Sequence, residues 1–364
     1  MNTADVDSRH VVAALAMTAL ALAGCSSPED GDPAPASAQA SPAPEGGTAE
    51  SPTEVKASTS LLEWVAAPGA VDNTVTTNGT WFLTVESSGH SYRLDGPDKS
   101  FGTEEPTRIS TALLDTGWAV VVRQDQAEKQ PAVAEVTDLG DGSQYKIGQD
   151  GDVKTTAGGT WALGGDTLVH ATIGPDGDYC VATVDLVTRV PSRGWCVPPE
   201  HGFNAAHVTS AGIALLTFDD AKPTCRTVGT VSGESMEPFA GVPDCKAWEG
   251  AVLEDDQAVW SVIPDESDVD AAEFFARNGD EYFDLGPGTS SSLVPCADAA
   301  YFVRDPEIEG DPAQLLRWDG SSLTVVYEAP PGQSYLDAPR CGDNALVVTA
   351  LSEGGDEQVM AALG

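Results

Sequence analysis

Basic side chains are scarce in this sequence of 364 residues. Lysine and arginine together number 18 against 57 aspartates and glutamates, which gives a formal net charge of −39 at pH 7. A surface this acidic repels phosphate backbones and anionic lipid headgroups, so the composition argues against nucleic-acid binding. Strong negative charge also keeps proteins soluble, and that simpler role requires no partner.

Side chains that carry catalysis or bind metals are also few. The chain has five histidines, no Cys-x-x-Cys pair and no Gly-x-Ser-x-Gly elbow that would mark a serine nucleophile. His201 and His207 in HGFNAAH match no strong zinc spacing, and we expect His207 to face the surface of a sheet. The two Asp-Gly-Asp sequences lack the further ligands of a calcium loop and are typical of tight turns. The sequence therefore predicts no metal, no cofactor and no recognisable catalytic residue.

Long hydrophobic runs are absent except near the start. Residues 11–24, VVAALAMTALALAG, fall short of the roughly 20 residues needed to span a bilayer and suit the core of a signal peptide. Leu-Ala-Gly-Cys at 22–25 resembles the lipobox of bacterial lipoproteins. The resemblance implies that residues 1–24 are a signal peptide, that Cys25 is acylated, as with palmitate, and that the protein is anchored at the extracytoplasmic face of the cell membrane. An ordinary secretory signal with an incidental cysteine is the alternative.

Large apolar side chains are nearly missing from residues 26–60, which are rich in Pro, Ser, Ala and Glu. A segment of this composition cannot bury enough apolar surface to offset its ordering entropy. We therefore expect residues 25–59 to be a disordered tether that begins at the lipidated cysteine. The folded domain is predicted to comprise residues 60–364.

Helical patterns are few in residues 60–364, whereas short runs rich in Val, Leu, Ala and aromatic residues recur between turn residues. Seven similar runs, such as WAVVVRQ, lie about 37 to 50 residues apart. They start at Thr80, Trp118, Asp166, Gly212, Gln257, Ala299 and Asn344. One strand-like segment precedes each run and others follow it, which gives four strands per unit. The sequence predicts an all-β fold, a seven-bladed β-propeller.

The two ends of the domain support the same count. The last unit stops one strand short, and SLLEWVA at residues 60–66 is similar to SLTVVYEA in the sixth unit. We expect residues 60–66 to supply the missing outer strand and so to close the ring, which hides an otherwise exposed sheet edge.

The third unit carries a family resemblance. VATVDLVTRVPSRGW at 181–195 resembles the repeat of pyrroloquinoline-quinone-type propellers, with Arg189 in place of the turn glycine. LLRWDGSSLTVVYE in the sixth unit is similar to WD-like and other bacterial propeller repeats. Both resemblances concern the fold and carry over no cofactor residues.

Six cysteines remain after Cys25, and an even number in an exported domain indicates disulfides. Cys180 begins the third strand of its unit and Cys196 ends the fourth, and Cys225 and Cys245 occupy similar places one unit later. Cys296 and Cys341 follow the innermost strands of neighbouring units. We predict the pairs Cys180–Cys196, Cys225–Cys245 and Cys296–Cys341; one or more free buried thiols are the alternative.

These observations favour a lipid-anchored, monomeric, non-catalytic binding or scaffold module. An enzyme acting on cell-surface glycans or quinone-linked substrates, with catalytic residues on scattered loops, is the alternative.

Acidic turns between second and third strands cluster in the later units, where a cationic partner could bind. A solvated rim that only prevents aggregation is the simpler explanation. The candidate partner-binding residues are Asp265, Glu266, Asp268, Asp270, Glu307, Glu309 and Asp311.

Overall fold

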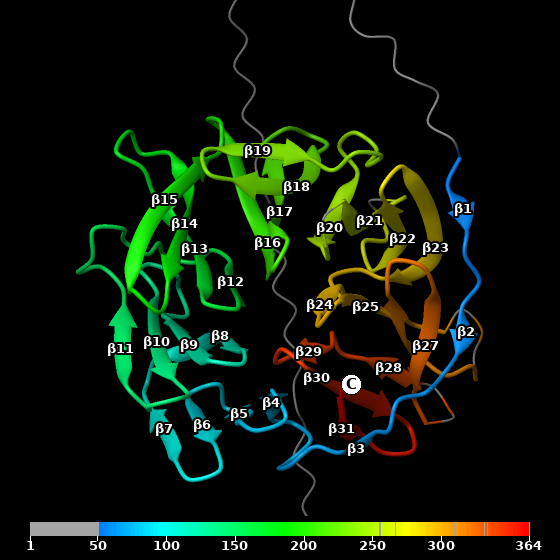
Figure 1. Ribbon diagram of the computed structural model, residues 1–364, viewed down its shortest axis with the longest axis horizontal. Helices are drawn as coiled ribbons and strands as arrows, with labels where there is room; N and C mark the ends of the chain where they lie inside the picture. The colour runs from blue at the N-terminus through cyan, green and yellow to red at the C-terminus, as the bar shows by residue number, and fades with distance from the viewer. Residues whose placement is uncertain are drawn as a thin grey trace, which may run out of the picture. The chain divides into compact units, whose positions relative to one another are not determined.

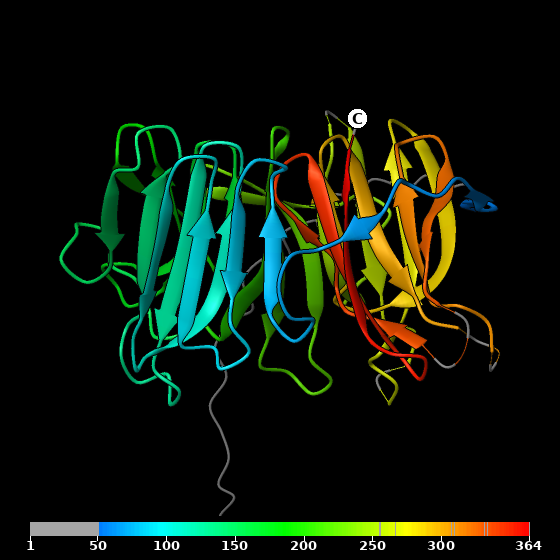
Figure 2. The same cartoon turned by 90° about the horizontal axis from the view of Figure 1, so that it is seen from below.

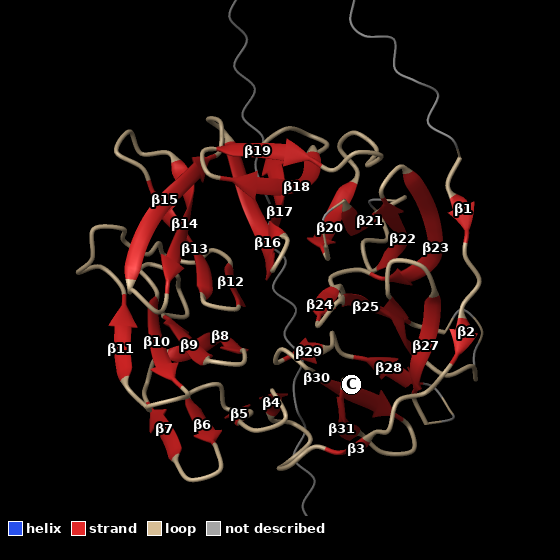
Figure 3. Ribbon diagram, viewed as in Figure 1, coloured by secondary structure: helices blue, strands red, loops and turns tan. Residues whose placement is uncertain are grey.

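The computed structural model describes residues 51–254, 256–265, 267–306, 308, 310–330, 332 and 334–363. The predictions for the signal peptide, for Cys25 and for residues 26–50 lie outside this part of the chain. Within it the regular elements are all strands (Figure 3). No helix in these residues could span a membrane.

Seven sheets surround a common centre, and their strands run between the two faces of the ring (Figures 1 and 2). Counted from the centre outward, blades 1 to 4 are β4 Thr74–Thr77, β5 Phe82–Val85, β6 Ser91–Asp95, β7 Ser100–Glu104; β8 Arg108–Leu114, β9 Trp118–Gln124, β10 Val133–Asp138, β11 Gln144–Ile147; β12 Trp161–Gly164, β13 Thr167–Ile173, β14 Tyr179–Asp185, β15 Val190–Cys196; and β16 His201–Thr209, β17 Gly212–Asp219, β18 Arg226–Ser232, β19 Ser235–Pro238. The predicted seven-bladed propeller is confirmed.

The remaining blades also take strands from the start of the domain. Blades 5 to 7 are β20 Ala247–Val252, β21 Gln257–Val262, β22 Ala271–Asn278, β23 Glu281–Thr289 with β1 Thr53–Glu54; β24 Val294–Cys296, β25 Ala299–Arg304, β26 Gln314–Trp318, β27 Leu323–Glu328 with β2 Ser58–Thr59; and β28 Ser334–Leu336, β29 Arg340–Cys341, β30 Ala345–Ser352, β31 Glu357–Ala362 with β3 Val65–Ala66. In blade 7 both β28 and β29 pair with β30, so the innermost strand is divided in two.

The second strand of each blade is the one that the sequence shows most clearly. All seven residues of β9 are buried, whereas the outermost strand β7 has one half-buried residue among exposed ones. A strand covered on both faces by neighbouring blades can be apolar on both sides, so it appears as a continuous run. An outer strand has no such constraint.

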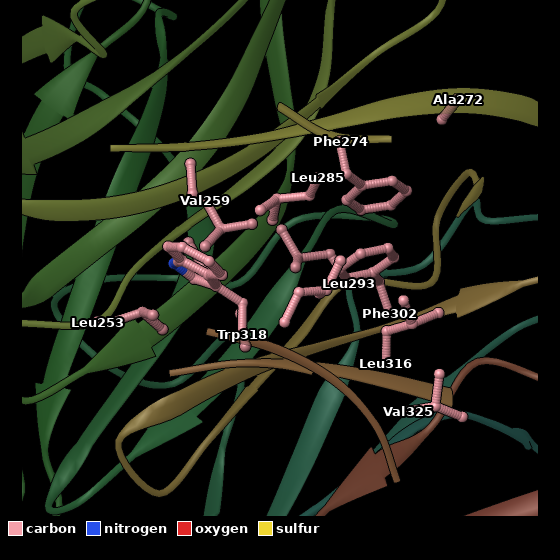
Figure 4. Close-up of a cluster of buried hydrophobic side chains, with 14 of the residues drawn as sticks. Leu253, Val259, Ala272, Phe274, Leu285, Leu293, Phe302, Leu316, Trp318 and Val325 are labelled. Carbon is pink, nitrogen blue, oxygen red and sulfur yellow. The ribbon is translucent and has the colours of Figure 1, made fainter. Parts of the chain in front are cut away.

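Hydrophobic clusters join consecutive blades. Six of them fill the junctions from blade 1 to blade 7, and the cluster between blades 5 and 6 centres on Phe274 and Phe302, whose rings stack with centroids 4.1 Å apart (Figure 4). Trp318, which is fully buried, extends the same cluster. Each of these six junctions therefore excludes water over a continuous apolar surface.

The junction between blade 7 and blade 1, here called the seam, is held differently. Arg340 donates from Nε to the backbone oxygen of Val75 at 2.8 Å, and Gln358 donates from Nε2 to that of Asn73 at 2.9 Å. Gly342 lies so close to Thr77 that a Cβ atom at residue 342 would overlap the Thr77 backbone. In the described residues no hydrophobic cluster crosses the seam, so close backbone packing and polar contacts hold it.

The start of the domain runs along the outer edges of blades 5, 6 and 7, and we call residues 53–67 the strap. β1 pairs in parallel with β23, β2 in parallel with β27, and β3 antiparallel with β31. The predicted closing strand within 60–66 is confirmed, since β3 completes blade 7. The boundary of the tether was wrong: β1 and β2 fall within 25–59, because backbone hydrogen bonds to sheet edges order a segment whose side chains stay exposed.

All three predicted disulfides are confirmed. Cys180 and Cys196 lie opposite each other on β14 and β15, and the third bond joins the inner strands of blades 6 and 7. In the turn between β14 and β15, Arg189 adopts a φ of 60° and its guanidinium lies 4.5 Å from the centre of the Tyr145 ring. An arginine is therefore tolerated at the position where we expected the repeat to favour glycine.

Trp64 should contribute much of the strap's stability. Its Nε1 donates to the backbone oxygen of Val326 at 2.8 Å, and its ring meets Tyr327 edge-on at 5.1 Å. We expect Trp64→Ala to lower the free energy of unfolding by about 2 kcal/mol, measured by urea denaturation. Leu61→Ala is the control, because Leu61 is 53% exposed and should change it by less than about 0.5 kcal/mol. Equal effects of the two substitutions would show that the strap does not depend on this anchor.

Candidate functional site in the central cavity

A cavity of about 770 Å³ lies where the innermost strands converge. Its wall is made by the ends of β8, β12, β16, β24 and β29 and by the turns that follow them, with Thr76 from blade 1. Among the described residues, β20 of blade 5 contributes no side chain to this wall. The volume falls within the range of small-molecule sites, which makes this cavity the first candidate for function.

Polar contacts between neighbouring blades fix the turns around the cavity. Asn78 donates from Nδ2 to the backbone oxygen of Asp115 at 2.9 Å, and the backbone nitrogen of Gly165 donates to Asp115 Oδ2 at 3.1 Å. On the other side the backbone nitrogen of Ala297 donates to the backbone oxygen of Asp343 at 3.1 Å. The disulfide Cys296–Cys341 joins the same two turns. The groups at the cavity are therefore held in place before any ligand arrives.

Asp115 is the carboxyl in the wall whose acidity is most clearly altered. Burial raises its pKa, the negative charge of Asp343 adds to the rise, and hydrogen bonds from the backbone nitrogens of Thr116 and Gly165 oppose it. The sequence placed Asp115 in the turn LLDTGW, but the burial that raises its pKa, the opposing hydrogen bond from Gly165 of blade 3 and the charge of Asp343 of blade 7 do not follow from that turn. Only the assembled ring brings those groups together.

His207 enters the cavity because β16 contains a bulge. The pairing of β16 with β17 shifts between Asn204 and His207, and Ala205 adopts a left-handed φ of 47°. A bulge changes the direction in which the following side chains point. His207 is one of the residues that line the cavity, a position that the sequence did not predict. Desolvation lowers its pKa to about 4, so its half-buried ring is neutral at pH 7.

Arg340 is the one basic side chain in the wall, and two of its nitrogens donate hydrogen bonds within the protein. Nε bonds to Val75 across the seam, and Nη2 donates to Thr349 Oγ1 at 3.0 Å. The wall also carries the carboxylates of Asp115, Asp298 and Asp343. The described residues hold no cluster of three or more His, Cys, Asp or Glu side chains arranged to bind a metal ion.

The predicted partner-binding residues lie elsewhere. Turns between second and third strands are at the opposite ends of the strands from the turns that line the cavity, because neighbouring strands are antiparallel. Asp265, Asp268, Asp270 and Asp311 are exposed there, while Glu266, Glu307 and Glu309 lie outside the described residues. The Asp265 carboxylate accepts hydrogen bonds from the backbone nitrogen and hydroxyl of Ser267, which lowers its pKa. Binding of a cationic partner at these turns stays a prediction.

No protein-family model matches this chain, and no curated protein matches it in sequence. Several solved structures are similar in fold. The oligogalacturonate lyase of Vibrio parahaemolyticus matches with a TM-score of 0.50 and 12% identity, over 85% of this chain and 99% of that one. The β-propeller domain of the Trilobed protease from Pyrococcus furiosus matches with a TM-score of 0.49 and 10% identity, over 85% and 98%.

A structure from a study of two prolyl endopeptidases matches with a TM-score of 0.49 and 14% identity, over 79% of this chain but 46% of that one. The present chain thus spans about half the length of that peptidase. At these identities the similarity shows the fold, a β-propeller, and nothing finer. The resemblance of residues 181–195 to pyrroloquinoline-quinone-type repeats stays a prediction.

These comparisons contradict the prediction of a non-catalytic binding or scaffold module. That prediction rested on the absence of a recognisable catalytic motif in the sequence. An oligogalacturonate lyase is among the solved structures of similar fold, so the lack of the catalytic motifs that we sought does not make this chain non-catalytic. A role for this chain has to be argued from its own cavity.

A buried carboxyl in blade 5 supports the cavity wall from behind. Glu249 on β20 is 3% exposed and accepts hydrogen bonds from the backbone nitrogen of Leu293 at 3.1 Å and from Ser261 Oγ at 3.2 Å. Leu293 directly precedes Val294, the first residue of β24 in the wall. Burial raises the pKa of Glu249 from 4.5 to about 7, although its hydrogen bonds oppose the rise.

The raised pKa of Glu249 predicts a pH-dependent loss of stability. The carboxyl of Glu249 keeps its proton up to about pH 7 in the folded protein but only up to about pH 4.5 in the unfolded chain. Its contribution to the free energy of unfolding is therefore complete below pH 4.5 and is lost as the pH rises to 7. Relative to Glu249→Gln, the wild type should lose on the order of 3 kcal/mol of unfolding free energy between pH 4.5 and 7.5, measured by denaturation. A constant difference between the two proteins over this range would contradict the assignment.

Proposed function

We propose that this protein is an enzyme whose substrate binds in the central cavity and undergoes acid–base chemistry there. One observation carries the proposal: a carboxyl of raised pKa, Asp115, and a neutral imidazole, His207, line the same cavity of ligand size. Titratable groups with shifted pKa values that share a cleft are the usual signature of catalytic sites.

The two groups suit different tasks. Asp115 holds its proton to a higher pH than an ordinary aspartate, so it can donate that proton to a leaving group or take it back. His207 stays neutral, and a neutral imidazole can both donate and accept a hydrogen bond, which fits it to orient and polarise the substrate. The backbone nitrogen of Gly165 and the fixed turns keep Asp115 in position during the transfer.

Backbone strain supports this assignment. Of nine described non-glycine residues with positive φ, Ala297 and Asp343 line the cavity and Ala205 sits two positions before His207. Left-handed conformations cost roughly 1–2 kcal/mol in residues other than glycine and are concentrated at functional sites. The left-handed residues Ala205, Ala297 and Asp343 lie in or beside the cavity wall, as expected if the wall is shaped to bind a ligand.

The acid–base role can be tested with a panel of chromogenic glycosides, oligosaccharides and peptide anilides. We expect turnover of at least one substrate class, lowered about 100-fold or more in Asp115→Asn and clearly reduced in His207→Gln. Asp178→Asn is the control, because Asp178 is exposed in the turn between β13 and β14 on the opposite face. Turnover that survives both cavity substitutions would place the chemistry outside this cavity.

We also propose that the protein is a lipoprotein tethered at the extracytoplasmic face of the cell membrane. The support is the sequence Leu-Ala-Gly-Cys at 22–25 after an apolar run, followed by a segment poor in large apolar residues. Cys25→Ser should remove the acyl label and release the protein from the membrane fraction, whereas Ser26→Ala should change neither. Membrane retention of an unlabelled Cys25→Ser protein would contradict the lipoprotein assignment.

A further inference from the structure

His170 is a buried titratable residue that the proposed reaction does not use. It lies on β13 of blade 3, its side chain is fully buried, and its Nδ1 lies 2.8 Å from the backbone oxygen of Ala171. Since a carbonyl oxygen can only accept a hydrogen bond, Nδ1 carries the ring proton and Nε2 is the bare nitrogen. Nε2 is buried and has no hydrogen-bond partner in the described residues. A second proton would therefore be added at an atom that nothing stabilises.

The surroundings of His170 are apolar. Trp161 on β12 and Ala182 on β14 lie opposite it in the sheet. Across the junction, β9 and β10 of blade 2 present apolar residues, and the titratable side chain there is Tyr145 of β11. The charged groups around this junction have other contacts; they are Asp166, which accepts a hydrogen bond from Trp118 Nε1, and Arg189, Asp138 and Asp185, which besides burial affect the pKa of Tyr145.

The neutral form of His170 is therefore strongly favoured in the fold. Burial lowers the pKa of His170 below its ordinary value of 6.5, the hydrogen bond to Ala171 opposes the lowering, and no charged group in the described part of the chain contributes. The arrangement around the neutral ring is fully stable above about pH 6.5. It loses stability as the pH falls below 6.5 toward the lowered pKa.

Trp161 connects the buried imidazole to the central cavity. Its ring stacks on that of His170, with centroids 5.0 Å apart and planes inclined by 24°. Trp161 also lines the cavity, so one indole contacts both. The attraction of an imidazolium to the face of an indole is weaker than the cost of burying an unpaired charge. A protonated His170 therefore gains more from water than from the stack, and displacement of Trp161 would let water of the cavity reach it.

The strand that carries Trp161 is built to move. β12 has four residues, and the glycines Gly159 before it and Gly165 after it have φ values of 98° and 55°. Glycine adopts such angles readily, and a few residues at the ends of an element can absorb the backbone change of a hinge. The backbone nitrogen of Gly165 donates to Asp115 Oδ2 at 3.1 Å. A shift of β12 would therefore also reach the carboxyl that we assign to proton transfer.

We propose that His170 is a pH switch for the central cavity: protonation at Nε2 releases Trp161 from the stack and shifts β12, which changes the cavity wall and the hydrogen bond that holds Asp115. The proton comes from the solvent and is returned when the pH rises, so the change is reversible. An effect on turnover rests on the proposed function of the cavity, whereas the movement of Trp161 does not.

The test is fluorine NMR of the protein with 5-fluorotryptophan in place of its eight tryptophans, recorded between pH 7.5 and 4.5. Trp161→Phe identifies the signal of residue 161. We expect this signal to shift and to acquire the solvent isotope effect of an exposed fluorine as the pH falls below 6.5. In His170→Phe, which keeps a ring on Trp161 but cannot take a proton, the signal should not respond; His170→Gln is the second variant. Thermal unfolding at each pH establishes that the proteins are folded.

Two histidines serve as controls. His201 is exposed and His207 lines the cavity, and the response should persist in His201→Gln and in His207→Gln. A Trp161 signal that stays unchanged down to pH 4.5 would overturn the inference. A response that survives in both folded His170 variants, or that disappears in His207→Gln, would assign the trigger to another group.

Global acid unfolding gives a different result. All fluorotryptophan signals would then change together and the thermal transition would be lost, which would reject a local switch. Because these measurements need no substrate, their failure leaves the proposed function standing. Equally, a cavity that turns over none of the tested substrates leaves the movement of Trp161 to be decided by its own signal.

Discussion

Closure at the seam between blades 7 and 1 is the constraint on which this ring depends. Every other junction is filled by a hydrophobic cluster, whereas the seam is held by contacts such as that of Arg340 with Val75 and by the close approach of Gly342 to Thr77. The chain itself crosses the seam once, where it passes from β3 on the outer edge of blade 7 to β4 at the centre of blade 1. To open the ring there, β3 must be stripped from β31.

The elements beside the seam are reinforced accordingly. The strap adds a strand to each of blades 5, 6 and 7, and the disulfide Cys296–Cys341 joins the inner strands of blades 6 and 7. The disulfide does not cross the seam, but it holds the inner strand of blade 7 to blade 6 and so limits how far blade 7 can move away from blade 1. Because Asp343 and Ala297 lie next to that disulfide, the stability of the seam and the geometry of the cavity depend on the same contacts.

The fold could be predicted from sequence because its strongest signal is local. Strands such as β9 are buried on both faces, so each blade shows one continuous apolar run, and seven runs at regular spacing determine the architecture. The disulfides followed once Cys180 and Cys196 had been assigned to neighbouring strands. The strands β1 and β2 escaped prediction because each has two residues, both exposed, and is held by backbone hydrogen bonds that leave no pattern in the sequence.

The site could not be predicted, for a different physical reason. No single blade contains it: Asp115, His207 and Asp343 come from blades 2, 4 and 7, and their properties arise from desolvation and charge in the assembled ring. His207 depends in addition on a bulge at Ala205, which a sequence pattern of period two treats as an ordinary strand. The strand periodicity therefore predicts the propeller but not the residues of its central cavity, because those residues depart from the repeat.

Such departures are tolerated because the blades supply stability elsewhere. The apolar clusters between blades reach the cavity wall, since Ala162 and Ala206 belong to a cluster and also line the cavity, so the left-handed residues at 205, 297 and 343 stand beside well-packed strands. Glu249 is a further polar group of this kind: its carboxyl is costly to bury, and it accepts a hydrogen bond from the backbone of Leu293, which belongs to the apolar cluster between blades 5 and 6. The ring supplies the stability, and the cavity retains polar, strained and charged groups that a sequence selected for stability alone would have replaced.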